Sequence, residues 1–285
     1  MHEIIDHTVN LLDRFDFTGN MLNRLRMRAA LKKGKAVKAA RQIELTMPAT
    51  WEFSGFSQNG EDGILDVLLS NLLNSNSNCI EIGVSDGMQN NTAWLIVAEN
   101  FNGIMIEGNP LFASRAKLIT RQCHNMFVTC DNVQKIKSMS SELYPDVFSL
   151  DIDGNDYYIA KAILEAGFRP KIFVVEFNSV YGPERSVTIE YQEDFIYTKA
   201  HPTHLYYGVS IMGWTNYFES QDYKFVTVDT NGVNAFYVDP AFFDDSFLHD
   251  IKKLKFSENI HQYNKFKMTS NDQFKLIADK KLFVI

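Results

Sequence analysis

Short apolar runs alternate with stretches of helical spacing through the middle of the chain. The apolar runs lie at residues 79–84, 103–108, 126–131, 146–153 and 171–178. Helical spacing marks the segments between them, at 90–101, 110–121, 133–143 and 154–167. Fully apolar strands that alternate with helices are typical of a parallel sheet that is covered on both faces.

Two further strands, 224–230 and 234–240, are expected after a helix at 205–219. Asn231-Gly232 joins the two strands, and an Asn-Gly pair between apolar runs is a strong hairpin signal. The pattern therefore predicts an α/β fold with an open, mostly parallel sheet that ends in an antiparallel C-terminal hairpin.

The chain is expected to divide into three parts. Residues 1–45 combine near-helical apolar spacing with many Ala, Leu and basic residues, which predicts a helical N-terminal extension. Gly34 is a candidate break in that helix. Residues 46–240 hold the sheet and its helices, and residues 241–285 are expected to form a C-terminal extension packed on this domain.

Charge is distributed unevenly along the chain. The formal net charge is −7, yet residues 17–43 contain eight Lys and Arg and no acid, a local charge of +8. The acidic remainder argues against nucleic acid as a partner of the main domain. The basic helix is interpreted as a solvated helix, as an arm that contacts a second copy in a homodimer, or as a helix that lies on an anionic membrane or polymer.

The number of cysteines and the length of the apolar runs bear on the cellular location. Cys79, Cys123 and Cys130 are too few for a disulfide framework. No run reaches the roughly 18 apolar residues of a membrane span, and the first residues lack the cationic region of a signal peptide. We therefore expect a cytoplasmic protein without a transmembrane segment.

A glycine-containing loop follows the first predicted strand, with Glu81, Gly83 and Gly87 in the run EIGVSDG. Ligands of open α/β sheets bind at the carboxyl ends of the strands. The dinucleotide fingerprint GxGxxG fails, because Ser85 and Met88 occupy its second and third glycine positions. The acid-x-Gly-x-x-x-Gly spacing remains. Glu81 suits a cationic ligand such as a sulfonium, or else it is a structural partner of the loop amides.

The next two predicted strands also end in polar residues. Glu107 and Asn109 follow the second strand, and an acid at this point can accept both hydroxyls of a ribose. Asp131 and Asn132 follow the third strand, where an acid-amide pair can hydrogen-bond an adenine amino group. Three polar strand ends in this order predict a nucleoside-containing cofactor.

The fourth and fifth strands end in acids. Asp151 and Asp153 are two positions apart on one strand, so both side chains point to the same side. Glu176 ends the neighbouring strand. Like charges this close repel, so a divalent cation is expected, and all-oxygen ligands suit Mg²⁺ or Mn²⁺. His204 is a candidate nitrogen ligand that would favour Mn²⁺. The alternative is that Asp151 contacts a methyl donor or substrate without metal, with Asp153 or His204 as the catalytic base.

These motifs resemble class I S-adenosylmethionine-dependent methyltransferases, and more closely the FkbM-like methyltransferases, over residues 55 to 240. The resemblance rests on five segments, FSQNGED (56–62), EIGVSDG (81–87), IEGNP (106–110), SLDIDGNDYYI (149–159) and GVNAFYV (232–238). It implies a Rossmann-like fold in which Gly83 and Gly87 line the methionine portion of the cofactor and Glu107 binds ribose. It also implies that the segment containing Gln58 packs over the cofactor. The long basic N-terminal arm departs from the family pattern.

The resemblance also bears on the reaction. The acids at the fourth and fifth strand ends are similar to the ligands of metal-dependent O-methyltransferases. An O-methyltransferase that acts on a small molecule or glycan precursor is therefore expected, with a sugar hydroxyl or a phosphorylated precursor as acceptor, in capsule, surface-glycan or secondary-metabolite biosynthesis. SLDIDGNDYY is also similar to methyltransferases of capsule clusters that install methyl phosphoramidate. The alternatives are a phosphohydrolase that uses Asp151 and Asp153, and a non-catalytic scaffold with the cofactor fold.

Overall fold

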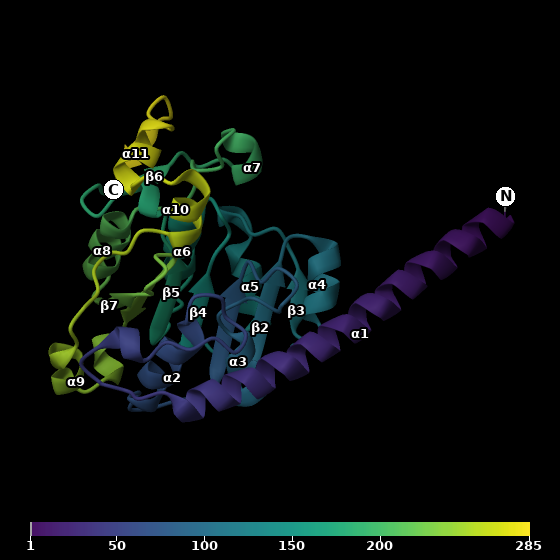
Figure 1. The fold of residues 1–285 in the computed structure, drawn as a ribbon, viewed down its shortest axis with the longest axis horizontal. Helices are drawn as coiled ribbons and strands as arrows, with labels where there is room; N and C mark the ends of the chain where they lie inside the picture. The colour runs from purple at the N-terminus through teal and green to yellow at the C-terminus, as the bar shows by residue number, and fades with distance from the viewer. Residues whose placement is uncertain (1) are drawn as a thin grey trace.

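A seven-stranded sheet runs through the middle of the protein (Figure 1). The computed structural model describes the backbone of residues 2–285 and the side chains of residues 21–285. The sheet has the order β3-β2-β1-β4-β5-β8-β7. Its strands are β1 (Asn78–Ile82), β2 (Asn102–Glu107), β3 (Cys123–Asn125), β4 (Val147–Leu150), β5 (Ile172–Glu176), β7 (Lys224–Val228) and β8 (Asn234–Val238).

The first five strands are parallel, and the last two form an antiparallel hairpin that pairs with β5 through β8. Strand order reverses beside β1, between β1 and β4, which is where ligands bind in open sheets. The predicted α/β fold, with its mostly parallel Rossmann-like sheet and C-terminal hairpin, is confirmed.

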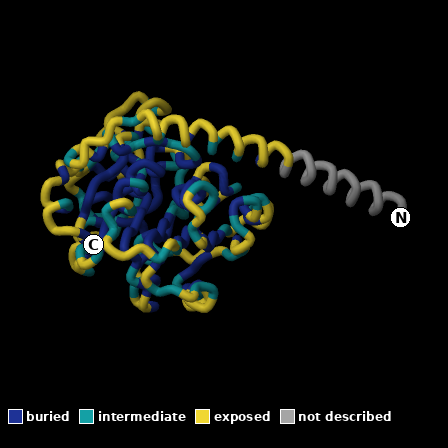
Figure 2. Tube along the Cα trace, turned by 90° about the horizontal axis from the view of Figure 1, so that it is seen from below, coloured by how far each residue is buried: buried dark blue, intermediate teal, exposed yellow. Residues whose placement is uncertain are grey.

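Helices cover both faces of this sheet. The helices along the described backbone are α1 (His2–Ala40), α2 (Glu61–Ser70), α3 (Ala93–Ala98), α4 (Pro110–Ala116), α5 (Val133–Met139), α6 (Asp156–Glu165), α7 (Tyr197–Ala200), α8 (Ile211–Ser220), α9 (Asp245–Asp250), α10 (Ile260–Phe266) and α11 (Ser270–Lys275). Of these, α7, α10 and α11 contribute to a separate, smaller core. Alternate residues of a strand enter different cores, so that Cys79 packs with α2 and α3 while Ile80 packs with α5, α6 and α8. The central strands β1, β4, β5 and β8 are buried along nearly their whole length, in the dark blue interior of Figure 2, which explains their apolar runs.

Several predicted boundaries are wrong. The third strand was expected at 126–131, but β3 ends at Asn125, and residues 130–132 form a 3-10 turn. The helix expected at 205–219 begins only at Ile211, because the Ser210 side chain accepts a hydrogen bond from the Gly213 amide and caps it. The spacing of apolar residues does not indicate such capping contacts, although they decide where a helix begins.

The C-terminal residues 241–285 pack on the sheet domain. Phe243 and Leu248 enter the core beneath α2 and α3. At the chain end, β9 (Leu282–Val284) pairs with β6 (Val187–Ile189) in a second, two-stranded sheet. This small sheet and the core beside it were not predicted, because β6 and β9 are short and far apart in sequence.

Helix α1 is continuous, so the candidate break at Gly34 is wrong. A Cβ atom at this position would overlap the Trp94 ring, and the absence of a side chain lets α1 approach α3 closely. Lys38 pairs with Asp66 at 2.7 Å and with Glu99 at 2.8 Å. Within the described residues, no helix has both the length and the apolarity needed to span a membrane.

Candidate functional site

A cavity of about 700 Å³ lies at the carboxyl ends of β1, β2 and β4. Six of the predicted site residues line it, namely Gln58, Gly83, Glu107, Asn109, Asp151 and Asp153. Phe112, Phe127 and Val128 give it an apolar wall. The cavity therefore combines apolar side chains with a few carboxylates, a combination typical of small-molecule sites.

Gly83 allows two strand ends to meet under this cavity. Its φ is +88°, and a Cβ atom would overlap the carbonyl oxygen of Asp151. Its amide donates to the Ile106 carbonyl at 2.9 Å, which ties the loop to β2. Only glycine adopts this backbone without strain while another chain segment lies so close.

Gly83→Ala is expected to destabilise the fold by about 2 kcal/mol more than Gly208→Ala, because the added methyl group overlaps backbone. Gly208 is the matched control, since its φ is also positive (+61°) and no atom lies within 4 Å of an added Cβ. Urea denaturation of both variants measures the difference. Equal destabilisation would mean that backbone conformation alone, and not the contact with Asp151, requires Gly83.

Glu107 ends β2 at the floor of the cavity. Its carboxylate accepts hydrogen bonds from the amides of Ser85 and Asn109, each at 2.7 Å. A carboxylate has about four acceptor positions, so the two bonds leave Glu107 able to accept from a diol. Asn109 caps α4 by accepting from the Leu111 amide at 2.9 Å. Glu107 thus joins the first two loops of the cavity.

Glu81 does not line the main cavity. It is buried, and its carboxylate accepts from the Asn91 amide, the Thr92 amide and the Thr92 hydroxyl. Burial raises the pKa of Glu81, while these hydrogen bonds favour its charged form. The interpretation of Glu81 as a structural partner of loop amides matches these contacts.

Gly87, Asp131 and Asn132 also lie outside the lining of the main cavity. Gly87 has a φ of +79° and packs against Ile119 and Ala116, so it serves a turn and a helix contact. Asp131 is exposed, and Asn132 donates to the Phe127 carbonyl and accepts from the Thr129 amide. The predicted position of Asp131 and Asn132 at the end of the third strand is wrong, because that strand ends at Asn125.

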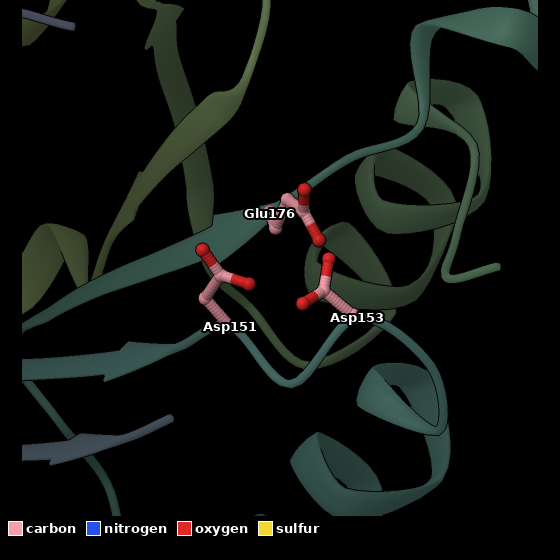
Figure 3. A group of neighbouring side chains, drawn as sticks. All are labelled: Asp151, Asp153 and Glu176. Atoms are coloured by element: carbon pink, nitrogen blue, oxygen red, sulfur yellow. The ribbon is translucent and has the colours of Figure 1, made fainter. Parts of the chain in front are cut away.

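The predicted carboxylates at the fourth and fifth strands do come together. Asp151, Asp153 and Glu176 each offer an oxygen within 4.8 Å of the others, and Figure 3 shows all three carboxylates pointing into one space. Burial, followed by the charges of its neighbours, raises the pKa of Asp151 and of Glu176 well above the usual range. Burial raises the pKa of Asp153 to about 6. Three acids forced together in this way can share protons or hold a cation.

A loop, rather than strand alternation, brings Asp153 to this group. β4 ends at Leu150, and Asp153 has a φ of +53°, a conformation that Asp tolerates better than most residues. Asp156, the first residue of α6, holds the loop by accepting from the amides of Ile152 (2.9 Å) and Gly154 (2.8 Å). This is the helix-terminal role that acids favour.

His204 is not part of the carboxylate group. Its ring packs edge-on against Tyr197, with centroids 5.9 Å apart, and among the described residues the group that could hold a metal contains carboxylates only. The structure therefore does not bring His204 into this group, and its role as a metal ligand stays a prediction. With oxygen donors alone, the argument for Mn²⁺ over Mg²⁺ is lost.

A second cavity of about 200 Å³ adjoins the carboxylates and shares Gln58, Gly83, Gln89 and Asp151 with the main cavity. Half of its lining residues are Asn or Gln, among them Asn90 and Asn234. Neither Asn90 nor Asn234 was predicted from the sequence. They come from the loop before α3 and from β8, so no spacing along the chain signals that they meet.

Comparison with known proteins gives similarity in fold at low identity. No protein-family model matches the chain, and no curated protein matches it. An O-methyltransferase from Bacillus cereus in complex with SAH is 14% identical, over 74% of this chain and 88% of that chain, with a TM-score of 0.40. The O-methyltransferase TomG from Streptomyces achromogenes, in complex with SAM, is 15% identical over 72% of this chain and 93% of its own, with a TM-score of 0.41.

Proposed function

We propose that the protein is an S-adenosylmethionine-dependent O-methyltransferase of the FkbM-like type. The observation that carries the proposal is the cavity at the ends of β1, β2 and β4, with Glu107 at its floor and three carboxylates at its edge. The cofactor would supply an electrophilic methyl group. The protein would align the acceptor oxygen with that group and remove its proton.

The residues of the main cavity suit the cofactor. Glu107 has free acceptor positions for a ribose diol, and Phe112, Phe127 and Val128 offer apolar surface to an adenine. Gln58 lies at the junction of the two cavities, in the segment that the family resemblance places over the cofactor. Gly83 allows the backbone of Asp151 to approach the end of β1 closely, which brings the first and fourth strand ends together.

Asp151, Asp153 and Glu176 would hold a divalent metal, Mg²⁺ or Mn²⁺, which would assist by lowering the pKa of an acceptor hydroxyl. The donor set suits a hard cation, since every donor is a carboxylate oxygen. Without metal, Asp153 is the base, because its raised pKa of about 6 suits proton abstraction near neutral pH. The acceptor would be a sugar or a phosphorylated precursor in surface-glycan, capsule or secondary-metabolite biosynthesis.

Calorimetric titration with S-adenosylhomocysteine tests the proposal. We expect binding that EDTA does not change, since Glu107 and the apolar wall are separate from the carboxylate group. Absence of binding would contradict the proposal. Phosphate release from a phosphate ester would then favour the phosphohydrolase, and cofactor binding without any transfer would favour the scaffold.

Metal binding is expected to weaken as the pH falls. A carboxylate must lose its proton to bind a cation, and the pKa of Asp153 is raised to about 6. Asp153 is therefore mostly ionised at pH 7.5 and mostly protonated at pH 5.5. Titration with Mg²⁺ and with Mn²⁺ should give at least about fourfold weaker binding at pH 5.5 from the protonation of Asp153 alone. Equal affinity at both pH values would mean that the metal does not bind these acids.

We also propose that α1 joins two copies of the chain. Met21, Leu22 and Leu25 are more than half exposed on α1, although they are apolar (55%, 58% and 53%). Leu25→Glu is expected to convert a dimer to a monomer in sedimentation velocity, because a charge would enter the apolar contact. Leu73→Glu is the matched control, since Leu73 is equally exposed on another surface (60%). A wild-type protein that sediments as a monomer would exclude this contact.

A further inference from the structure

The second cavity is placed to receive the group that is methylated. Asp151 and Glu176 line it, and it shares Gln58, Gly83, Gln89 and Asp151 with the main cavity. We infer that this cavity is the acceptor site and that it takes an uncharged, polyhydroxylated group such as a sugar ring, rather than a phosphate ester. The inference rests on the proposed methyltransferase function and narrows its acceptor class.

The size of the cavity suits one ring. Its volume of about 200 Å³ corresponds to roughly six water molecules at about 30 Å³ each. Half of its lining residues are Asn or Gln, and each amide both donates and accepts. Sugar hydroxyls also donate and accept, so such a lining can pair with several hydroxyls at once.

Two buried amide atoms among the lining residues lack a protein partner. The Oδ1 of Asn90 accepts from the Ala93 amide at 3.1 Å, which leaves its Nδ2 unpaired. The Nδ2 of Asn234 donates to Glu61 at 2.7 Å, which leaves its Oδ1 unpaired. Both side chains are at least nine-tenths buried (5% and 3% exposed). Unpaired polar atoms of this kind are rare in native proteins. Neither atom has accessible surface, so a hydroxyl ligand pairs with them once the two amide side chains turn toward the cavity.

Charge argues against a phosphate ester in this cavity. Glu61, Glu81, Asp151 and Glu176 line it, and no Lys or Arg among the described side chains does. Phosphate sites normally contain Arg or Lys to form charge-assisted hydrogen bonds. A cation held by Asp151 and Glu176 would offset part of the negative charge, but the rest of the lining would still offer a phosphate no basic partner. His261, exposed in the first turn of α10, is the only imidazole among the lining residues.

The test uses the full chain saturated with S-adenosylhomocysteine, with and without Mg²⁺. Methyl glycosides of glucose, galactose and N-acetylglucosamine, and the 6-phosphates of glucose and galactose, are titrated under saturation-transfer NMR. We expect at least one neutral glycoside to bind and no phosphate to bind more tightly than its neutral counterpart. Binding of a phosphate tenfold or more tightly, or binding of no neutral glycoside, would overturn the inference.

A variant then locates the binding. Asn90→Ser keeps an oxygen that can cap α3 and removes the unpaired donor, so we expect about tenfold weaker glycoside binding and unchanged S-adenosylhomocysteine binding. Asn264→Ser, at an exposed position of α10, is the matched control. Unchanged glycoside affinity in a folded Asn90→Ser protein would place the ligand elsewhere.

The experiments distinguish a failure of the acceptor assignment from a failure of the methyltransferase proposal. If S-adenosylhomocysteine binds but no neutral glycoside does, the acceptor assignment is wrong and the methyltransferase proposal stands. If S-adenosylhomocysteine does not bind, the methyltransferase proposal is wrong, and the glycosides are titrated into the cofactor-free chain. Glycoside binding there that depends on Asn90 would support a sugar site with another function, and no binding would overturn the site.

Discussion

Glu107→Ala is expected to weaken S-adenosylhomocysteine binding about a hundredfold or more. Each hydrogen bond to a charged group contributes about 1.5–3 kcal/mol, and 1.4 kcal/mol corresponds to tenfold in affinity. The variant removes the acceptors for the ribose hydroxyls. It also frees the amides of Ser85 and Asn109, which the carboxylate holds at 2.7 Å. Isothermal titration calorimetry measures the affinity, and thermal unfolding checks that the variant is folded.

Asp131→Ala is the control for this experiment. Like Glu107, Asp131 is an acid that was predicted at the end of a strand, in this case the third. It is exposed and does not line the cavity. Unchanged affinity is therefore expected. If Asp131→Ala loses as much affinity as Glu107→Ala, Asp131 contacts the cofactor, as the sequence alone predicted, although it lies in a 3-10 turn and not at a strand end. If neither variant loses affinity, the main cavity does not bind the cofactor.

The cofactor half of the site could be predicted largely from strand ends. Apolar runs identify β1, β2, β4 and β5 because both faces of each strand are buried. Parallel strands place their carboxyl ends at one edge of the sheet. Gly83, Glu107 and Asp151 therefore meet in the structure, although they lie 24 and 44 positions apart along the chain.

The edge strand shows why the same reasoning failed for Asp131. β3 has only three residues and pairs on one side, with β2. Met126 and Val128 suggested a longer strand. The Met126 amide still donates to the Glu107 carbonyl of β2 at 2.9 Å, but the strand ends at Asn125 and Val128 packs into the core beyond it. An apolar run thus reports burial, and burial does not require strand geometry.

Glu81 and the second cavity show a different limit. The sequence places an acid at the end of β1, but whether it faces a ligand or the amides of Asn91 and Thr92 depends on the path of the following loop. Asn90 and Asn234 meet only because β8 pairs with β5 beside β4. Polar residues without regular spacing carry no signal until the tertiary fold is known.

Asp153→Asn is expected to abolish metal binding and methyl transfer while leaving S-adenosylhomocysteine affinity within about twofold. The substitution keeps the shape of the side chain but removes one of three anionic ligands, and even residues that only orient metal ligands contribute about 10–100-fold to affinity. Calorimetric titration with Mg²⁺ should lose its heat. Transfer from labelled S-adenosylmethionine to the glycosides that bind should fall about a thousandfold, since both the metal and the base are affected.

Asp194→Asn is the matched control, because Asp194 is exposed and outside both cavities. It should retain metal binding and transfer. Loss of transfer in Asp153→Asn with metal binding intact would identify Asp153 as a base rather than a ligand. Because Asp153 also lines the main cavity, a loss of cofactor affinity equal to that of Glu107→Ala would mean that the two parts of the site do not act separately. The carboxylates would then hold the methyl donor itself, and a cation at Asp151, Asp153 and Glu176 would be excluded by competition for the same oxygens.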